Sequence, residues 1–166
     1  MLHAGDPVVA IDRRSRIVRA RSGLEVAYDR LLLATGSSPV ILPVPGAQLK
    51  GVVGFRDLDD VGVMLAAARR GGHAVVIGGG LLGLEAANGL LRQGMAVTVV
   101  HLSDKLMNQQ LDPQAALLLK GALERRGLRL LLGVQTQEIL GEDTVEAVRF
   151  ACLLYTSDAA DDMQCV

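Results

Sequence analysis

The stretch AVVIGGGLLGLEA, residues 74–86, constrains the fold of this chain more than any other segment. Four apolar residues run into three consecutive glycines, and the stretch LLGLEAANGLLRQ, closed by Gly94, then has the character of a helix. Gly78, Gly80 and Gly83 fit G-x-G-x-x-G, a pattern that is weak alone but indicates dinucleotide binding between a buried strand and a helix. The sequence therefore predicts a strand, a phosphate-binding turn and a helix.

Each glycine of this pattern has its own physical reason. Gly78 permits the tight turn, Gly80 has no Cβ to keep the backbone from a pyrophosphate, and Gly83 lets the helix pack closely on the strand. The helix then begins at Leu81 and Leu82, where unpaired N–H groups and the positive end of the helix dipole favour a phosphate. The alternative is a glycine-rich turn that serves packing alone.

His101 stands where the second strand of such a unit ends, about 20 residues after the first glycine. An acid at this position commonly binds the adenosine ribose of NAD. Because His101 is not a carboxylate, the sequence does not indicate strict selectivity for NAD. A protonated histidine would favour a 2′-phosphate, whereas a neutral, half-buried one would not, and the neighbouring Asp104 and Lys105 carry opposite charges. The choice between NADH and NADPH stays open.

The residues before this unit predict a small sheet and one further strand. An antiparallel meander is predicted by three short runs, PVVAID, RIVRA and LEVAYD. Apolar and polar residues roughly alternate within each run, and polar turns separate the runs. RLLLATG, residues 30–36, is continuously apolar and is typical of a strand buried on both faces. Residues 37–47 contain three prolines and predict a loop.

The remaining segments predict an α/β fold with a Rossmann-like βαβαβ unit. HAVVI, AVTVV and LRLLLGV are expected to be buried strands, and TQEILGEDTVEAVRF a hairpin. Two helices have clear ends: one is capped by Asp57 and stopped by Gly71, and the other follows Asp112 and stops before Gly127. The second helix is expected to bury the residues that follow helical spacing, namely Ala115, Leu118, Leu119, Ala122 and Leu123.

Composition excludes several classes of partner. The formal net charge of −1 gives no reason to expect nucleic acid or an anionic membrane surface. The N-terminal residues lack the basic region and long apolar core of a secretory signal, so we expect a cytoplasmic protein. Residues 1–151 contain no cysteine, which excludes a redox dithiol or a cysteine metal cluster from that stretch.

Several longer strings resemble one family of flavoproteins. ATGSSPVILPVPG, GVVGFRDLDDV, GLLGLEAANGL and LMNQQLDPQAALLL are similar to the two-dinucleotide-binding flavoprotein reductases of the pyridine nucleotide-disulfide oxidoreductase superfamily, and most similar to the large subunits of NAD(P)H-dependent nitrite reductases. The resemblance implies a partial FAD domain (meander plus ATG strand) over residues 1–50, a linker helix over 51–71 and an NAD(P)-binding domain over 72–151. It also implies hydride transfer from NAD(P)H to FAD, with electrons passed on to an acceptor.

The same resemblance implies roles for further residues. The backbone of Val8, or of Val9, would meet the adenine of FAD. Glu85 would face the nicotinamide end of NAD(P)H, although it could also be an ordinary acid in the first turn of a helix. The residues of the ATG motif would lie near FAD: Ala34, Thr35 and Gly36.

In this family the first FAD turn, the iron–sulfur cluster and the sirohaem belong to other parts of the protein. We therefore expect this chain to be a middle fragment, inactive alone, whose partners are downstream redox domains or a small subunit. Because the neighbours of residues 30–36 would lie in the missing parts, the chain is expected to aggregate or to keep residues 1–45 mobile, while residues 72–134 protect their amides. Two alternatives are a rubredoxin or ferredoxin reductase component and a non-enzymatic dinucleotide sensor on the same scaffold.

The last residues differ in character from the rest. CLLYTSDAAD resembles the in-frame translation of the transposon end and adapter of tagmentation libraries. We therefore expect residues 152–166 to be a non-native, adapter-derived tail. The alternative is a natural acidic tail.

Overall fold

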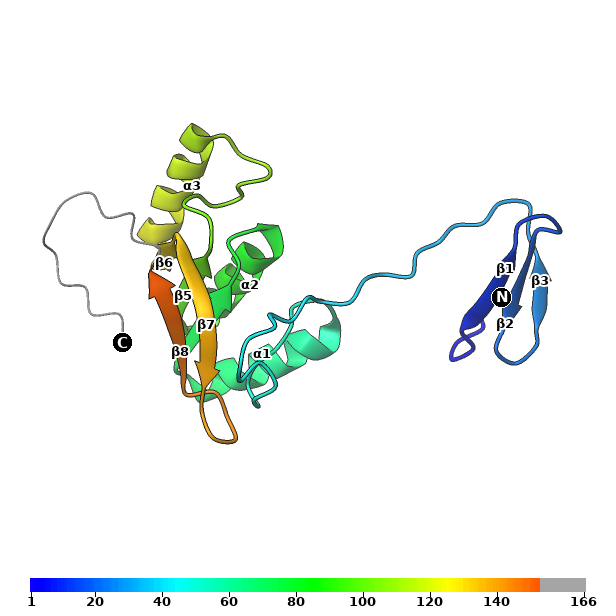
Figure 1. The fold of residues 1–166 in the computed structure, drawn as a ribbon, viewed down its shortest axis with the longest axis horizontal. Coiled ribbons are helices and arrows are strands. Elements are labelled where there is room, and N and C mark those ends of the chain that lie inside the picture. The colour runs from blue at the N-terminus through cyan, green and yellow to red at the C-terminus, as the bar shows by residue number, and fades with distance from the viewer. Residues whose placement is uncertain (153–166) are drawn as a thin grey trace, which may run out of the picture. The chain divides into compact units, whose positions relative to one another are not determined.

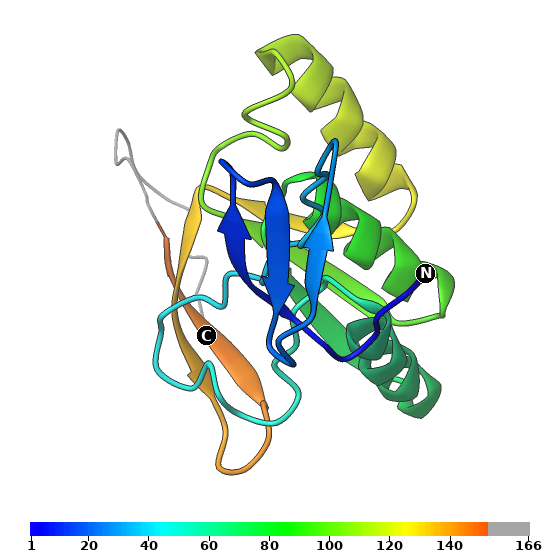
Figure 2. The same ribbon diagram turned by 90° about the vertical axis from the view of Figure 1, so that its right-hand side faces the viewer.

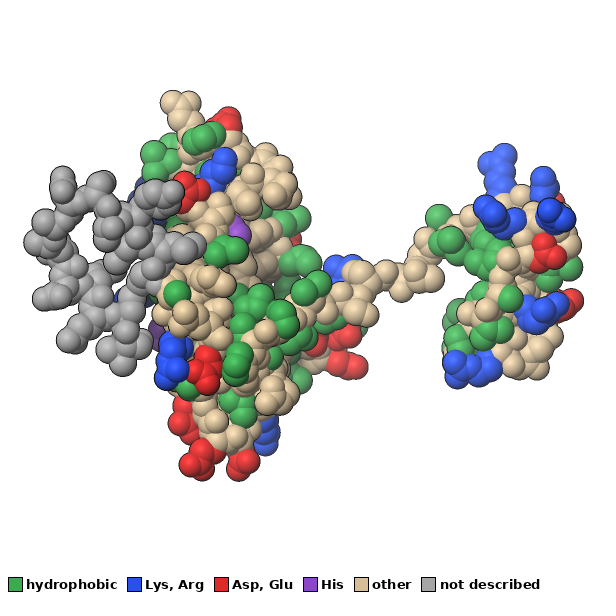
Figure 3. Space-filling model, viewed as in Figure 1, with side chains coloured by type: hydrophobic (Ala, Val, Ile, Leu, Met, Phe, Trp, Pro, Cys, Tyr) green, Lys and Arg blue, Asp and Glu red, His purple; other side chains and the backbone are tan. Residues whose placement is uncertain are grey.

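The computed structural model describes residues 1–152 of the chain and divides into two units, Met1–Ser37 and the part from Ser38 on (Figure 1). The first unit is an antiparallel meander of β1 (Val8–Asp12), β2 (Ile17–Ala20) and β3 (Glu25–Ala27), in that order. The predicted meander is therefore confirmed. Most of its apolar side chains are exposed, together with arginines (Figure 3), whereas Ala20 is buried.

The second unit is built on a parallel sheet. Its strands β4 (His73–Ile77), β5 (Ala96–His101) and β6 (Arg129–Leu132) lie in sequence order and are parallel. The helices α2 (Leu81–Arg92) and α3 (Pro113–Arg125) make the two crossovers. This arrangement confirms the predicted βαβαβ unit, and the parallel pairing follows from crossovers of this length.

Side chains at the helix ends explain where the helices begin. At α1 (Leu58–Arg70), the Asp57 carboxylate accepts a hydrogen bond from the Asp60 N–H at 3.0 Å, and the Asp60 carboxylate accepts one from the Asp57 N–H in return. At α3, the Asp112 carboxylate accepts from the Ala115 N–H at 2.8 Å. Both caps satisfy N–H groups that a helix leaves unpaired, as the sequence predicted.

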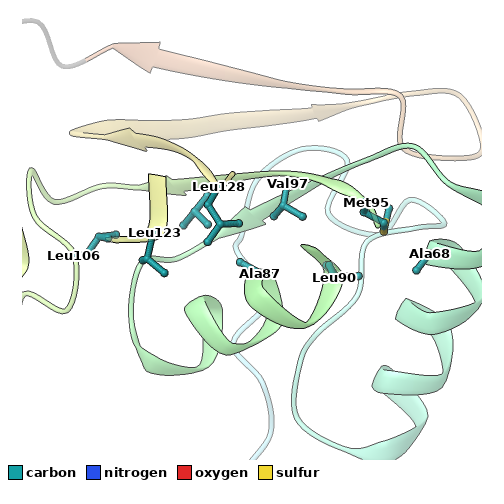
Figure 4. Packing of buried hydrophobic residues seen from close by; sticks show 9 residues of the cluster. Ala68, Ala87, Leu90, Met95, Val97, Leu106, Leu123 and Leu128 are labelled. Atoms are coloured by element: carbon teal, nitrogen blue, oxygen red, sulfur yellow. The ribbon is translucent and has the colours of Figure 1, made fainter. Parts of the chain in front are cut away.

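The core of the second unit lies between the parallel sheet and the helices (Figure 4). The central strand β5 supplies its middle because it is covered on both faces. Helix α2 contributes small side chains to the core, among them Ala87, which is fully buried. The cluster consists of Ala68, Ala87, Leu90, Met95, Val97, Val99, Leu106, Leu123 and Leu128.

A hairpin of β7 (Val134–Leu140) and β8 (Ala147–Cys152) contacts β5 on the face opposite the helices (Figure 2). It confirms the predicted hairpin, with the connection over residues 141–146. The Ile139 N–H donates to the Pro45 carbonyl and the Val145 N–H to the Lys50 carbonyl, each at 2.9 Å. These bonds attach residues 45–50 to the hairpin, within the second unit. The domain boundaries expected at residues 50 and 71 stay predictions.

The strand predicted over residues 30–36 is wrong. These residues form no strand and are exposed, and Leu32 keeps 87% of its surface. A strand needs hydrogen-bonding neighbours, and no strand within residues 1–152 pairs with this segment. Its apolar side chains consequently remain in solvent.

Two further expectations of burial are only partly met. The strands β4 and β6 lie at the edges of the sheet and are half-buried at most, so of the three expected buried strands only β5 is buried, over residues 97–100. On α3 the buried stripe runs through Ala116 and Leu123, whereas Leu118 is 75% exposed. Because α3 covers mainly β6, a narrow stripe suffices and the wider apolar face stays in solvent.

No helix within residues 1–152 has the length and apolarity that crossing a membrane requires. The predicted adapter-derived tail, apart from Cys152 at the end of β8, lies outside the described residues.

Hydrogen exchange of the complete 166-residue chain should distinguish the segments 30–36 and 98–100. We expect amides 98–100 of β5 to be protected, because these residues are buried and pair with strands on both sides. Amides 30–36 should exchange at the rate of an unstructured peptide, since they belong to no strand or helix. Equal protection of residues 30–36 and of β4 would contradict this description.

Candidate functional site

The turn between β4 and α2 begins at a glycine whose backbone geometry requires it. Gly78 has a φ of +127°, which residues with a Cβ rarely adopt. Its N–H donates to the Val100 carbonyl at 2.8 Å, so the turn is tied to the neighbouring strand β5. The tight turn predicted at Gly78 is present.

The next two glycines of the pattern have opposite surroundings. A Cβ placed on Gly83 would lie 2.0 Å from the Gly78 carbonyl oxygen, so only glycine lets α2 come this close to the turn. A Cβ placed on Gly80 would meet nothing within 4 Å. Gly83 is therefore needed for packing inside the protein, whereas Gly80 borders open space that a ligand can enter.

The first turn of α2 offers hydrogen-bond donors beside that open space. The Leu84 N–H donates to the Gly80 carbonyl at 3.0 Å, but within residues 1–152 no protein acceptor is found for the N–H groups of Leu81, Leu82 and Gly83. Gly80, the residue that caps the helix, has no side chain to accept them. Free donors at a helix N-terminus suit a phosphate, so the residues present fit a pyrophosphate.

His101 is the last residue of β5 and lies at the same edge of the sheet as the turn. Its side chain is half-buried, and its Nε2 is buried without a hydrogen-bond partner. The ring lies against Gly79, where a built Cβ would be 2.8 Å from His101 Cγ. The structure thus brings the glycine turn and His101 together.

Gly79 and the loop after β5 were missed by the sequence reasoning. The Met107 N–H donates to the Gly79 carbonyl at 2.9 Å, and Leu106 is fully buried beside the turn. A Cβ on Gly79 would lie 2.7 Å from Leu106 Cδ2. The only signal in the sequence was that residue 79 is also glycine, although the pattern requires glycine only at residues 78 and 80 on either side of it.

Glu85 borders an open groove of about 320 Å³ between the start of α1 and the start of α2. Phe55, Leu58 and Leu82 also line this groove. The carboxylate is exposed and makes no hydrogen bond or ion pair within the described part of the chain. The alternative of an acid in the first helical turn is wrong, since that turn contains no acidic residue.

The residues expected near FAD all lie in the first unit and are exposed. Val8 and Val9 are both in β1 and keep 55% and 57% of their surface. Ala34, Thr35 and Gly36 follow outside any strand. By themselves these residues do not enclose a cofactor, and their roles stay predictions.

The parallel sheet and the glycine turn are those of a Rossmann-like βαβαβ unit. Residues 1–159 match the pyridine nucleotide-disulphide oxidoreductase family, and the chain belongs to that family. The resemblance drawn from the sequence and the mixed α/β fold are thereby confirmed.

Individual relatives refine this membership. The chain is 50% identical over 149 residues to nitrite reductase [NAD(P)H] of Bacillus subtilis (strain 168), covering 90% of this chain and 18% of that protein. It is 45% identical to the assimilatory nitrate reductase electron transfer subunit of the same organism, covering 90% and 19%. Among solved structures, a ferredoxin reductase from Rhodopseudomonas palustris has a TM-score of 0.78 at 35% identity, covering 88% and 36%. The chain thus spans less than a fifth of the length of the two Bacillus relatives.

Two glycines of the same helix should respond oppositely to alanine. Gly83→Ala should lower the free energy of unfolding of the second unit by roughly 1–3 kcal/mol, because its Cβ collides with a backbone oxygen. Gly89→Ala should raise it by about 0.5–1 kcal/mol, because Gly89 lies in the helix interior with nothing within 4 Å of the built Cβ. Urea unfolding followed by circular dichroism measures both. A Gly83→Ala variant as stable as the parent would show that α2 can move away from the turn.

Proposed function

We propose that this chain is the NAD(P)H-binding part, with a portion of the FAD-binding part, of an FAD-dependent NAD(P)H oxidoreductase of the nitrite reductase type. The observation that carries the proposal is the turn after β4, where free N–H groups at the start of α2 border the open space at Gly80. The similarity to nitrite reductase [NAD(P)H] supports the choice of enzyme type.

In this proposal the N–H groups of Leu81, Leu82 and Gly83 donate to the pyrophosphate of NAD(P)H. The positive end of the α2 dipole adds to the attraction, and the missing Cβ of Gly80 lets the phosphates approach the backbone. His101, at the same sheet edge, borders the adenosine ribose. The three N–H groups bind and orient the dinucleotide, whereas the Nε2 of His101 is covered and donates to no ligand atom in this arrangement.

Glu85 is proposed to border the nicotinamide end, in the groove that also contains Leu82 and Phe55. The apolar side chains of that groove would contact one side of the nicotinamide, and the charged Arg56 and Asp57 also line it. FAD, when bound, supplies the hydride acceptor and divides the electron pair into single electrons. Val8, or its neighbour Val9, and the ATG residues Ala34, Thr35 and Gly36 would contribute to holding FAD.

The electrons would pass to redox centres outside residues 1–152. For the nitrite reductase type these are an iron–sulfur cluster and sirohaem in further domains, with a small subunit as partner. The similarity to a ferredoxin reductase favours a second candidate, in which a small redox protein accepts the electrons. The two candidates differ in whether the full-length protein reduces nitrite or a ferredoxin with NAD(P)H. A full-length protein that oxidises NAD(P)H with no acceptor, natural or artificial, would indicate a sensor.

The proposal requires that the chain binds nicotinamide dinucleotides at the glycine turn. Titration of the 166-residue chain with NADH, followed by nicotinamide fluorescence, should give saturable binding. Gly80→Val should weaken binding by at least about tenfold, because its side chain fills the space of the phosphates. Gly89→Ala, on the same helix, should bind like the parent. Saturable binding that Gly80→Val leaves unchanged would place the ligand elsewhere, and no binding by the parent chain would refute the proposal.

The residue at the end of β5 should influence which dinucleotide is preferred. His101→Glu should shift preference toward NADH by about 1–3 kcal/mol, because a carboxylate accepts from the 2′-hydroxyl and repels a 2′-phosphate. His73→Glu makes the same change at the first residue of β4, the end of that strand away from the glycine turn, and should leave the preference unchanged. The ratio of the NADH and NADPH dissociation constants measures the effect. An unchanged ratio in His101→Glu would show that residue 101 does not border the ribose.

A further inference from the structure

Gly79, the middle of the three glycines, contacts the residue that is expected to border the cofactor ribose. A Cβ on Gly79 would lie 2.8 Å from Cγ and 2.9 Å from Cδ2 of His101, and 2.7 Å from Cδ2 of Leu106. With glycine at residue 79, the imidazole rests against the turn and its Nε2 is buried without a partner. The position of the ring therefore depends on the absence of a side chain at residue 79.

We propose that glycine at residue 79 keeps the affinities for NADH and NADPH similar, because it lets the His101 ring lie against the turn with Nε2 covered. This inference rests on the proposed function, since it concerns the same dinucleotide site. Gly79 acts here as a positioning residue for His101.

The consequence for the pocket follows from which nitrogen is buried. Nε2 is the ring nitrogen farther from the main chain, so it is the one that could reach a ligand beside the strand. While it is buried, residue 101 offers neither a carboxylate to a 2′-hydroxyl nor its outer N–H to a 2′-phosphate. The pocket with Gly79 should accordingly bind both dinucleotides with similar affinity.

A methyl group at residue 79 would press on two side chains, the end of Leu106 and the ring of His101, and the ring has the more accessible space to move into. Leu106 is fully buried in the core cluster, and the Met107 N–H holds the Gly79 carbonyl at 2.9 Å. His101, by contrast, is half-buried at the end of its strand and can rotate toward solvent. Gly79→Ala should therefore turn the imidazole outward and expose Nε2 to the 2′ position of the ribose.

A double-mutant cycle on the 166-residue chain tests the coupling of the two residues. The four proteins are the parent, Gly79→Ala, His101→Ala and the double variant, and the quantity compared is the ratio of the NADH and NADPH dissociation constants. We expect Gly79→Ala to favour NADPH by about tenfold, the effect of one charge-assisted hydrogen bond to phosphate. His101→Ala should change the ratio by less than about twofold, and the double variant should return to the parent ratio. Gly89→Ala controls for an alanine added to the same segment.

Three results would overturn the inference: no shift in Gly79→Ala, an equal shift with and without His101, or a large shift in His101→Ala alone. If circular dichroism shows that Gly79→Ala does not fold, the His101→Ala variant tests the inference instead. A large change of the ratio of dissociation constants in His101→Ala would mean that the ring already contacts the cofactor, which overturns the inference. An unchanged ratio in His101→Ala together with lower reactivity of His101 than of His3 toward diethyl pyrocarbonate would support the buried ring. A parent chain that binds neither dinucleotide refutes the proposed function as well, whereas binding of both without dependence on residue 79 refutes this inference alone.

Discussion

The second unit depends on the close approach of α2 to the turn that precedes it. Any side chain on Gly83 would overlap the Gly78 carbonyl, so the helix can start directly above the end of β4 only with glycine there. This approach allows Ala87 to be buried against the sheet, where Val99 of the central strand is also fully buried. It also fixes the direction of the helix N-terminus, so the packing that stabilises the unit places its free N–H groups at the sheet edge where His101 ends β5.

Local chemistry made much of this unit predictable. Asp112 followed by Pro113 can begin a helix without help from the rest of the chain, and the Asp57 cap does the same. The change from four apolar residues to glycines located the end of β4 and the start of α2. These features depend on neighbours within a few residues, and the structure confirms them.

What depends on distant neighbours was not predictable. An apolar string such as residues 30–36 has the composition of a buried strand, but whether it forms one depends on strands that must lie on either side. Leu118 has helical spacing and is nevertheless exposed, because α3 covers only one edge of the sheet. The contact of Gly79 with His101 joins residues from two strand ends, and no spacing rule specifies such a pair. The cofactor roles of the individual site residues rest on the proposed function.

The exposed surface of the meander determines how heat would unfold the chain. All five residues of β1 and all three of β3 are exposed, and Ala20 is the buried apolar residue of this unit within the described part of the chain. The heat capacity increase on unfolding arises from apolar surface newly exposed to water. Melting of the meander exposes little surface that is not already wet, so it adds little to that increase. The heat-capacity step in a calorimetric scan of the chain accordingly comes mainly from the unit built around β5.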